Sequence, residues 1–68
     1  MMKYTIVETR SFTGGTLKGI TIEQETLSYS TEIEAANKAA ERIGQTGGGK
    51  GFGSPYKVVR AQVLEERV

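Results

Sequence analysis

The chain has 68 residues, with nine lysines and arginines against eight acidic residues and a formal net charge of +1. This length allows one domain with a small core, and so balanced a charge gives no bulk electrostatic reason to expect nucleic-acid binding. Cysteine and histidine are both absent. Their absence excludes disulfides, thiolate ligands, and the commonest general base and transition-metal ligand. We therefore expect a protein that is not an enzyme, with no catalytic, cofactor-binding or metal-binding residues.

The sequence also bears on the protein's surroundings. No apolar run approaches the length of a membrane span and no signal-peptide pattern opens the chain, so we expect a cytoplasmic protein without membrane contact. Chains this short bury little apolar surface and are often stabilised by oligomerisation or by docking to a partner. A compact, well-packed monomer is the alternative.

Two strands are expected in the first half of the chain. The segment Lys3–Thr9 alternates in polarity and is rich in β-branched residues, which predicts a strand. The pair Gly14-Gly15 can supply the positive φ angles of a tight hairpin turn. A second strand is predicted over Thr16–Thr26, with a bulge near Lys18-Gly19 to bring its apolar residues into phase. A further turn near Glu23–Glu25, which would split this strand, is the alternative.

The segment Thr31–Gly44 is the one expected helix. Thr31 and Glu34 have the spacing of a capping box, with Ser30 as a competing N-cap, and Gly44 suits the left-handed position that ends a helix. Spacings of three, four and three residues place apolar side chains in one stripe that is expected to pack on the sheet. The members of this stripe are Ile33, Ala36, Ala40 and Ile43.

A flexible, glycine-rich loop is expected over 44–55, followed by a third strand over Tyr56–Leu64 and a frayed end over Glu65–Val68. Residues 1–68 should therefore form a single small α+β domain in the order β-β-α-β. The preferred arrangement is a three-stranded antiparallel sheet, strand order 2-1-3, with the helix packed on one face. Placing the third strand parallel to the second, through a right-handed crossover, is the alternative.

The face of the sheet that the helix leaves uncovered is expected to be partly apolar and aromatic, which would indicate a partner surface. The alternative is that these apolar residues are scattered singly among polar ones, as is ordinary. The residues expected on this face are drawn from Tyr4, Ile6, Tyr56, Val58 and Leu64.

Two patterns resemble functional sites and are rejected. Residues 44–50 match the G-x-x-x-x-G-K half of a phosphate-binding loop, but Gly51 stands where Ser or Thr should hold magnesium. This loop also leaves a helix and enters a strand, whereas a phosphate-binding loop opens a helix. Glu23 and Glu25 lie two apart on a strand and could bind a cation, but no third ligand is evident, so we interpret them as solvated.

The predicted topology should bring the hairpin tip and the glycine-rich loop to the same end of the sheet. Aromatic and cationic side chains gathered there could stack bases and hold phosphates, or could anchor a protein interface. A flexible linker beside an ordinary turn is the alternative. The candidate partner-binding residues are Arg10, Phe12, Gly14, Gly15, Lys18, Lys50, Phe52, Tyr56, Lys57, Val58 and Arg60.

These observations favour a protein-binding domain that docks on a larger protein partner or self-associates, for example as a homodimer. Inhibitors and adaptors of phages and other mobile elements are often this small, which is an analogy of size and architecture only. The alternative function is binding of nucleic acid or a phosphate ligand through the glycine-rich loop and its neighbouring Lys, Arg and Phe residues. A carrier that encloses a small phosphorylated ligand in this loop is a third hypothesis.

Overall fold

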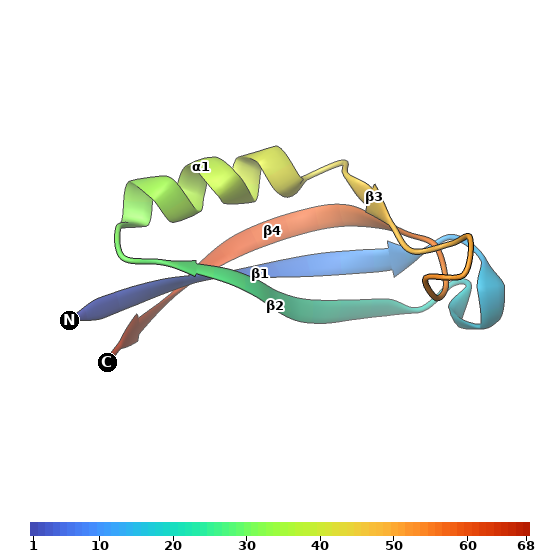
Figure 1. Cartoon of the computed structure of the whole chain (residues 1–68), viewed down its shortest axis with the longest axis horizontal. Coiled ribbons are helices and arrows are strands. Elements are labelled where there is room, and N and C mark those ends of the chain that lie inside the picture. The colour runs from blue at the N-terminus through green and yellow to red at the C-terminus, as the bar shows by residue number, and fades with distance from the viewer.

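The computed structural model describes all 68 residues as one helix packed against an antiparallel sheet. The elements in chain order are β1 (Met2–Phe12), a short 3-10 turn (Gly15–Leu17), β2 (Thr21–Tyr29), α1 (Glu32–Arg42), β3 (Thr46–Gly47) and β4 (Tyr56–Arg67). The strands lie in the order β2-β1-β4-β3, and every pairing is antiparallel. Figure 1 shows both termini at one end of the molecule and the glycine-rich loops at the other.

The α+β class and the order of the three long strands are confirmed, but the predicted three-stranded sheet is wrong because the sheet has four strands. The additional strand, β3, lies inside the predicted flexible loop and pairs Thr46 with Lys57 and Gly47 with Tyr56. Glycine is depleted in strands, so a two-residue strand in a glycine-rich segment leaves no recognisable pattern.

The strands are longer than predicted or are displaced along the chain. β4 continues through the segment predicted to fray, because Tyr4 pairs with Glu65 and Met2 with Arg67. β2 begins at Thr21, since Gly14 and Gly15 lead into the 3-10 turn instead of a two-residue hairpin turn. The predicted bulge near Lys18-Gly19 is therefore wrong, and the β1–β2 register instead shifts between Thr5 and Val7. β2 is a single continuous strand, so the alternative split near Glu23–Glu25 does not occur.

The helix packs on the sheet through Ala35 and Ala39, which form the core with Ile6. Partly buried residues packed against this core come from all three long strands: Tyr4, Tyr29, Ala61 and Val63. The predicted packing stripe is wrong. Ile33 is 70% exposed and Ile43 is 52% exposed, and the other two members, Ala36 and Ala40, are also exposed. The four residues of the predicted stripe do lie along one side of α1, but that side is next to the buried face and is not the buried face itself.

The N-terminus of the helix also differs from the prediction. No side chain caps it, although Thr31 has the extended backbone of an N-cap residue. The Thr31 hydroxyl donates a 2.6 Å hydrogen bond to the Glu34 carboxylate. The two side chains of the predicted capping box therefore bond to each other and not to the backbone amides.

The face of the sheet away from the helix is mostly polar, with Val7 and Leu64 scattered among polar side chains, so the alternative holds and the predicted apolar and aromatic face is wrong. Side chains alternate between the two faces along a strand, and Ile6 faces the helix, which places Tyr4 on the same side. Arg10 and Phe12 lie an even number of residues after Ile6 on β1, so their side chains point to the helix side. Val58 and Tyr56 pair with these two residues and point the same way. Of the residues expected on the outer face, only Leu64 lies there, opposite Thr5.

The helix covers less than half of the sheet's length. Eleven helical residues span about 16 Å, whereas the eleven residues of β1 span about 36 Å in a molecule 40 Å long. The part of the helix-side face near the glycine-rich loops is consequently left without a helical cover, as Figure 1 shows.

Candidate functional site

The structure brings the hairpin tip and the glycine-rich loop together, as the topology predicted. The Thr13 amide donates a 2.9 Å hydrogen bond to the Pro55 carbonyl, and the Leu17 amide donates to the Ser54 hydroxyl at 3.4 Å. A Cβ on Gly14 would lie 3.1 Å from the Pro55 ring, so the two segments are in contact. We call residues 13–19 together with residues 44–55 the glycine rim.

The loop of the glycine rim has defined backbone geometry. The Phe52 amide donates to the Gly49 carbonyl at 2.9 Å, and the Gly49 amide donates to the Gly53 carbonyl at 2.8 Å. Lys50 and Gly51 have φ angles of 50° and 91°, the positive values that both central residues of a type I′ turn require. This turn projects the Lys50 and Phe52 side chains outward, and Phe52 is 84% exposed.

Several of the candidate partner-binding residues are used inside the molecule instead. Val58 and Phe12 are buried, so neither presents its side chain at the surface. The Phe12 ring meets the Tyr56 ring edge-on at 5.7 Å, and the Arg10 guanidinium lies 4.4 Å from the centre of the Tyr56 ring on its face. A Cβ on Gly47 would collide with the Tyr56 ring, so this aromatic cluster packs against a bare stretch of β3.

The remaining candidates are accessible. Gly14 is half-buried beside Pro55, and Gly15, Lys18, Lys50 and Phe52 are exposed around the glycine rim. Lys57 and Arg60 are also exposed, opposite Ser11 and Thr9 on the face away from the helix. The structure thus gathers Lys18, Lys50 and Lys57 at one end but on different surfaces, and places Arg60 farther along β4, level with Glu23. Their role in binding stays a prediction.

Charge is distributed unevenly along the long axis. Residues 9–22 and 43–58, which build the end with the glycine rim, contain no acidic residue. Their cations are Arg10, Lys18, Lys50 and Lys57. The other residues carry all eight glutamates and five cations, so a charge of +4 at one end opposes −3 in the remainder, which sums to the net +1. This separation was not evident from the net charge.

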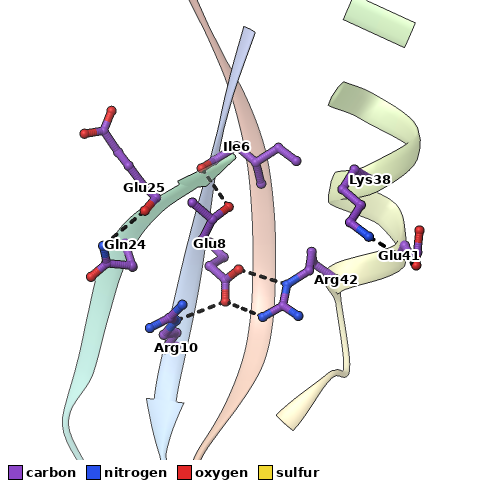
Figure 2. Close-up of polar contacts among 9 residues, drawn as sticks. Ile6, Glu8, Arg10, Gln24, Glu25, Lys38, Glu41 and Arg42 are labelled. Atoms are coloured by element: carbon purple, nitrogen blue, oxygen red, sulfur yellow. Dashed lines mark hydrogen bonds and ion pairs between the residues drawn. The ribbon is translucent and has the colours of Figure 1, made fainter. Parts of the chain in front are cut away.

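A buried ion network, missed by the sequence analysis, fixes the helix on the sheet. Glu8 is fully buried, and its carboxylate accepts two 3.0 Å hydrogen bonds from Arg42 at the end of α1. Arg10 donates a third, also at 3.0 Å. Figure 2 shows Arg42 reaching from the helix to the carboxylate on β1, with Arg10 below it. The sequence held one indication of this network: Glu8 is two residues after Ile6 on β1, so its side chain must point to the same face of the sheet as Ile6.

Burial alone would raise the pKa of the Glu8 carboxyl. Hydrogen bonds from Arg42 and Arg10, together with their positive charges, outweigh that effect and hold the pKa below its ordinary value. The hydrogen bond to Glu8 in turn raises the pKa of Arg42. This network also explains why the predicted helix stripe is exposed. Rotating α1 to bury Ile33 would withdraw Arg42 and leave a buried carboxylate short of partners, which is strongly destabilising.

The structure contains no pocket and no group of three or more potential metal-ligating side chains. No helix has the length and apolar character needed to cross a membrane. No family model, curated protein or solved structure matches the chain.

Proposed function

We propose that this protein is a non-enzymatic interaction domain that docks on a protein partner or on a second copy of itself. The observation that supports this proposal is the small amount of apolar surface that the fold itself covers. Only five apolar residues are buried, whereas eleven large apolar side chains are at least 36% exposed. A surface this apolar favours a bound state in which part of it is covered.

Five of the eleven exposed apolar side chains lie in two places. One is the flank of α1 that carries Ile33 and Ile43, and the other lies on the helix-side face of the sheet beyond the end of α1. There Ile22 lies opposite Arg10, and Ile20 and Leu17 follow toward the hairpin tip. Both places lie on the side of the sheet that carries the helix, whereas Leu64, which is 47% exposed, lies on the outer face.

The test is light scattering coupled to size exclusion, together with retrieval of binding proteins by the immobilised chain. The proposal predicts a discrete oligomer, or a stoichiometric complex with a retrieved protein. Replacing Ile20 and Ile22 by Ser probes one apolar area, and replacing Ile33 and Ile43 by Ser probes the other. A strictly monomeric protein that retrieves nothing would contradict the proposal.

A second candidate function is binding of nucleic acid or another polyanion at the glycine rim. The acid-free end and the exposed Phe52 favour it, because cations hold phosphates and an aromatic ring stacks on bases. Fluorescence anisotropy with single- and double-stranded oligonucleotides at about 50 mM salt should then show binding that weakens steeply as salt rises.

Variants at the glycine rim should separate this candidate from non-specific attraction. Lys50→Ala and Phe52→Ala are expected to weaken oligonucleotide binding. Lys38→Ala, in the predominantly acidic part of the molecule, is the matched control and should have little effect. Binding that is absent at low salt, or that is unchanged by the two rim variants, would remove this candidate.

A further inference from the structure

The strand β4 has an unpaired edge of defined length. On the side away from β1, the Val58 amide donates to the Gln45 carbonyl and the Val58 carbonyl accepts from the Gly44 amide, both at 2.8 Å. Beyond this point β4 has no neighbour on that side, since β3 pairs only with Tyr56 and Lys57. The open stretch therefore runs over 59–67, and its midpoint is Val63. An open edge of this kind is a template for another strand.

The exposed flank of α1 lies above this open edge. The helix packs over β1 and β4, and Arg42 reaches toward β1 to bind Glu8. The side of α1 that lies across the buried face from Arg42 therefore points toward the open edge of β4. We call the residues on that side, Ile33, Ala36, Ala40 and Ile43, the apolar flank. Their spacing of three, four and three residues reads the same in both directions, so the apolar flank is symmetric about its own midpoint, at the level of Lys38.

These two midpoints lie at the same height in the molecule. Ala35 and Ala39, which bracket the middle of the helix, belong to the core cluster with Ile6, and Val63 packs against that cluster. Ile6 and Val63 are also partners across the β1–β4 pairing. A single line drawn perpendicular to the sheet, just outside the open edge of β4, can therefore pass close to both Val63 and the centre of the apolar flank.

We propose that two copies of this chain form a dimer whose two-fold axis is this line. In the dimer, β4 pairs antiparallel with β4 of the second copy, and the two apolar flanks are in contact. This inference rests on the proposed function and identifies the partner and the surface. A two-fold interface requires a surface complementary to itself, and the matching midpoints of strand and helix supply that condition.

The pairing also matches in charge and in distance. Centring it on Val63 places Arg60 opposite Glu66 of the second copy, and both side chains project from the outer face. Strands are about 4.8 Å apart, so a helix axis above the gap between β1 and β4 would lie about 10 Å from its symmetry mate. Packed helices lie about 8–10 Å apart. The alanines at the centre of the apolar flank suit so close an approach.

The other open edge is not suited to self-pairing. Every charge on β2 is negative, since Glu23 and Glu25 are its only charged residues. Pairing β2 with β2 of a second copy would set like charges against one another, which is destabilising. The self-association surface is therefore the edge of β4 with the apolar flank.

The test is sedimentation equilibrium of the whole chain over a range of concentrations. The wild-type protein should form dimers, and Arg60→Glu should raise the dissociation constant about tenfold or more, because each dimer loses two ion pairs and gains two repulsions. The double variant Arg60→Glu, Glu66→Arg should restore most of the affinity. The matched control is Lys57→Glu, on the same face of β4 but outside the open stretch, which should leave the affinity unchanged.

A second pair of variants tests the helix independently. Ala36→Glu should weaken the dimer by at least tenfold, whereas Asn37→Glu, which adds the same carboxylate on the solvent side of α1, should not. Circular dichroism establishes that each variant is folded. A dimer unaffected by Arg60→Glu and Ala36→Glu, or no dimer at any concentration, would overturn this inference. A monomer that binds another protein through either apolar area would leave the proposed function standing, and a monomer that binds nothing would overturn both.

Discussion

Removing one arginine from the buried ion network should destabilise the protein far more than removing an ordinary surface ion pair. Arg42 supplies two of the three hydrogen bonds to a carboxylate with no exposed surface. The variant Arg42→Met keeps much of the side-chain volume but leaves Glu8 with Arg10 alone. Breaking a buried pair in this way costs about 3–5 kcal/mol, and we expect about 3 kcal/mol because Arg42 is itself partly exposed.

The stability lost in Arg42→Met is a large part of the total free energy of unfolding of so short a chain. A 68-residue domain is expected to have a free energy of unfolding of about 3–10 kcal/mol. A loss of about 3 kcal/mol should lower the Tm by roughly 12–24 °C. Thermal denaturation followed by circular dichroism measures this change directly.

The same variant should alter the dependence of stability on pH. In the wild-type protein the pKa of folded Glu8 lies below its ordinary value of 4.5. Its contribution to stability is therefore complete above pH 4.5 and is lost as the pH falls through the folded pKa. Arg42→Met removes two of the effects that lower this pKa while burial still raises it. The pKa should rise, so the loss of stability on acidification should shrink.

The matched control is the double variant Glu8→Met, Arg42→Met. Replacing a buried ion pair by apolar side chains of similar volume is often neutral or stabilising. The double variant should therefore recover most of the stability that Arg42→Met loses. A Tm that falls by less than a few degrees in the single variant, or a double variant less stable than the single one, would refute this account of how α1 is held.

Three further substitutions test local features. Gly47→Ala should lower the free energy of unfolding by about 1–3 kcal/mol, since the Tyr56 ring occupies the position of the new methyl group; an unchanged urea midpoint would contradict this packing. Lys50→Gly should stabilise the protein by up to about 1 kcal/mol, because Lys50 has a φ of 50°; a loss in the same assay would show that the side chain is needed. Ile33→Ser should change the stability of the dilute protein by less than about 0.5 kcal/mol, because the side chain is 70% exposed; a larger loss would mean that Ile33 packs on the sheet.

Local pattern was sufficient for the class of fold and the order of the long strands. Alternation in β1, the helical spacing of 32–42 and the position of Pro55 before β4 each agree with the structure. The loops met at one end as expected because that outcome depends only on the directions of the strands. These features follow from periodicity and connectivity, which a single sequence carries.

The rotation of the helix could not be predicted from its apolar residues alone. Two adjoining sets of apolar positions compete, and Ala35 and Ala39 are smaller and less conspicuous than Ile33 and Ile43. The deciding interaction is the contact of Arg42 with Glu8, residues 34 positions apart in the sequence. Charge neutralisation over that distance leaves no local periodic pattern.

The residues of the candidate site divide in the same way, into features that the sequence predicted and features that depend on contacts between distant segments. The exposed cations of the glycine rim were identified from composition and topology. The internal roles of Phe12, Val58 and Arg10 could not be, because they depend on the four-stranded sheet and on the packing of the Tyr56 ring over Gly47. The polar outer face was missed because the side of the sheet that α1 covers had not been assigned.

Hydrogen exchange of the β4 amides at low and high protein concentration tests most directly whether a second copy covers the open edge. The amides over 59–67 that do not pair with β1 should exchange freely in dilute protein and slow down together as concentration rises. Amides of the open β2 edge should exchange at the same rate in both samples. Exchange of the β4 amides that does not change with concentration, or protection that appears on β2 instead, would contradict the proposed dimer.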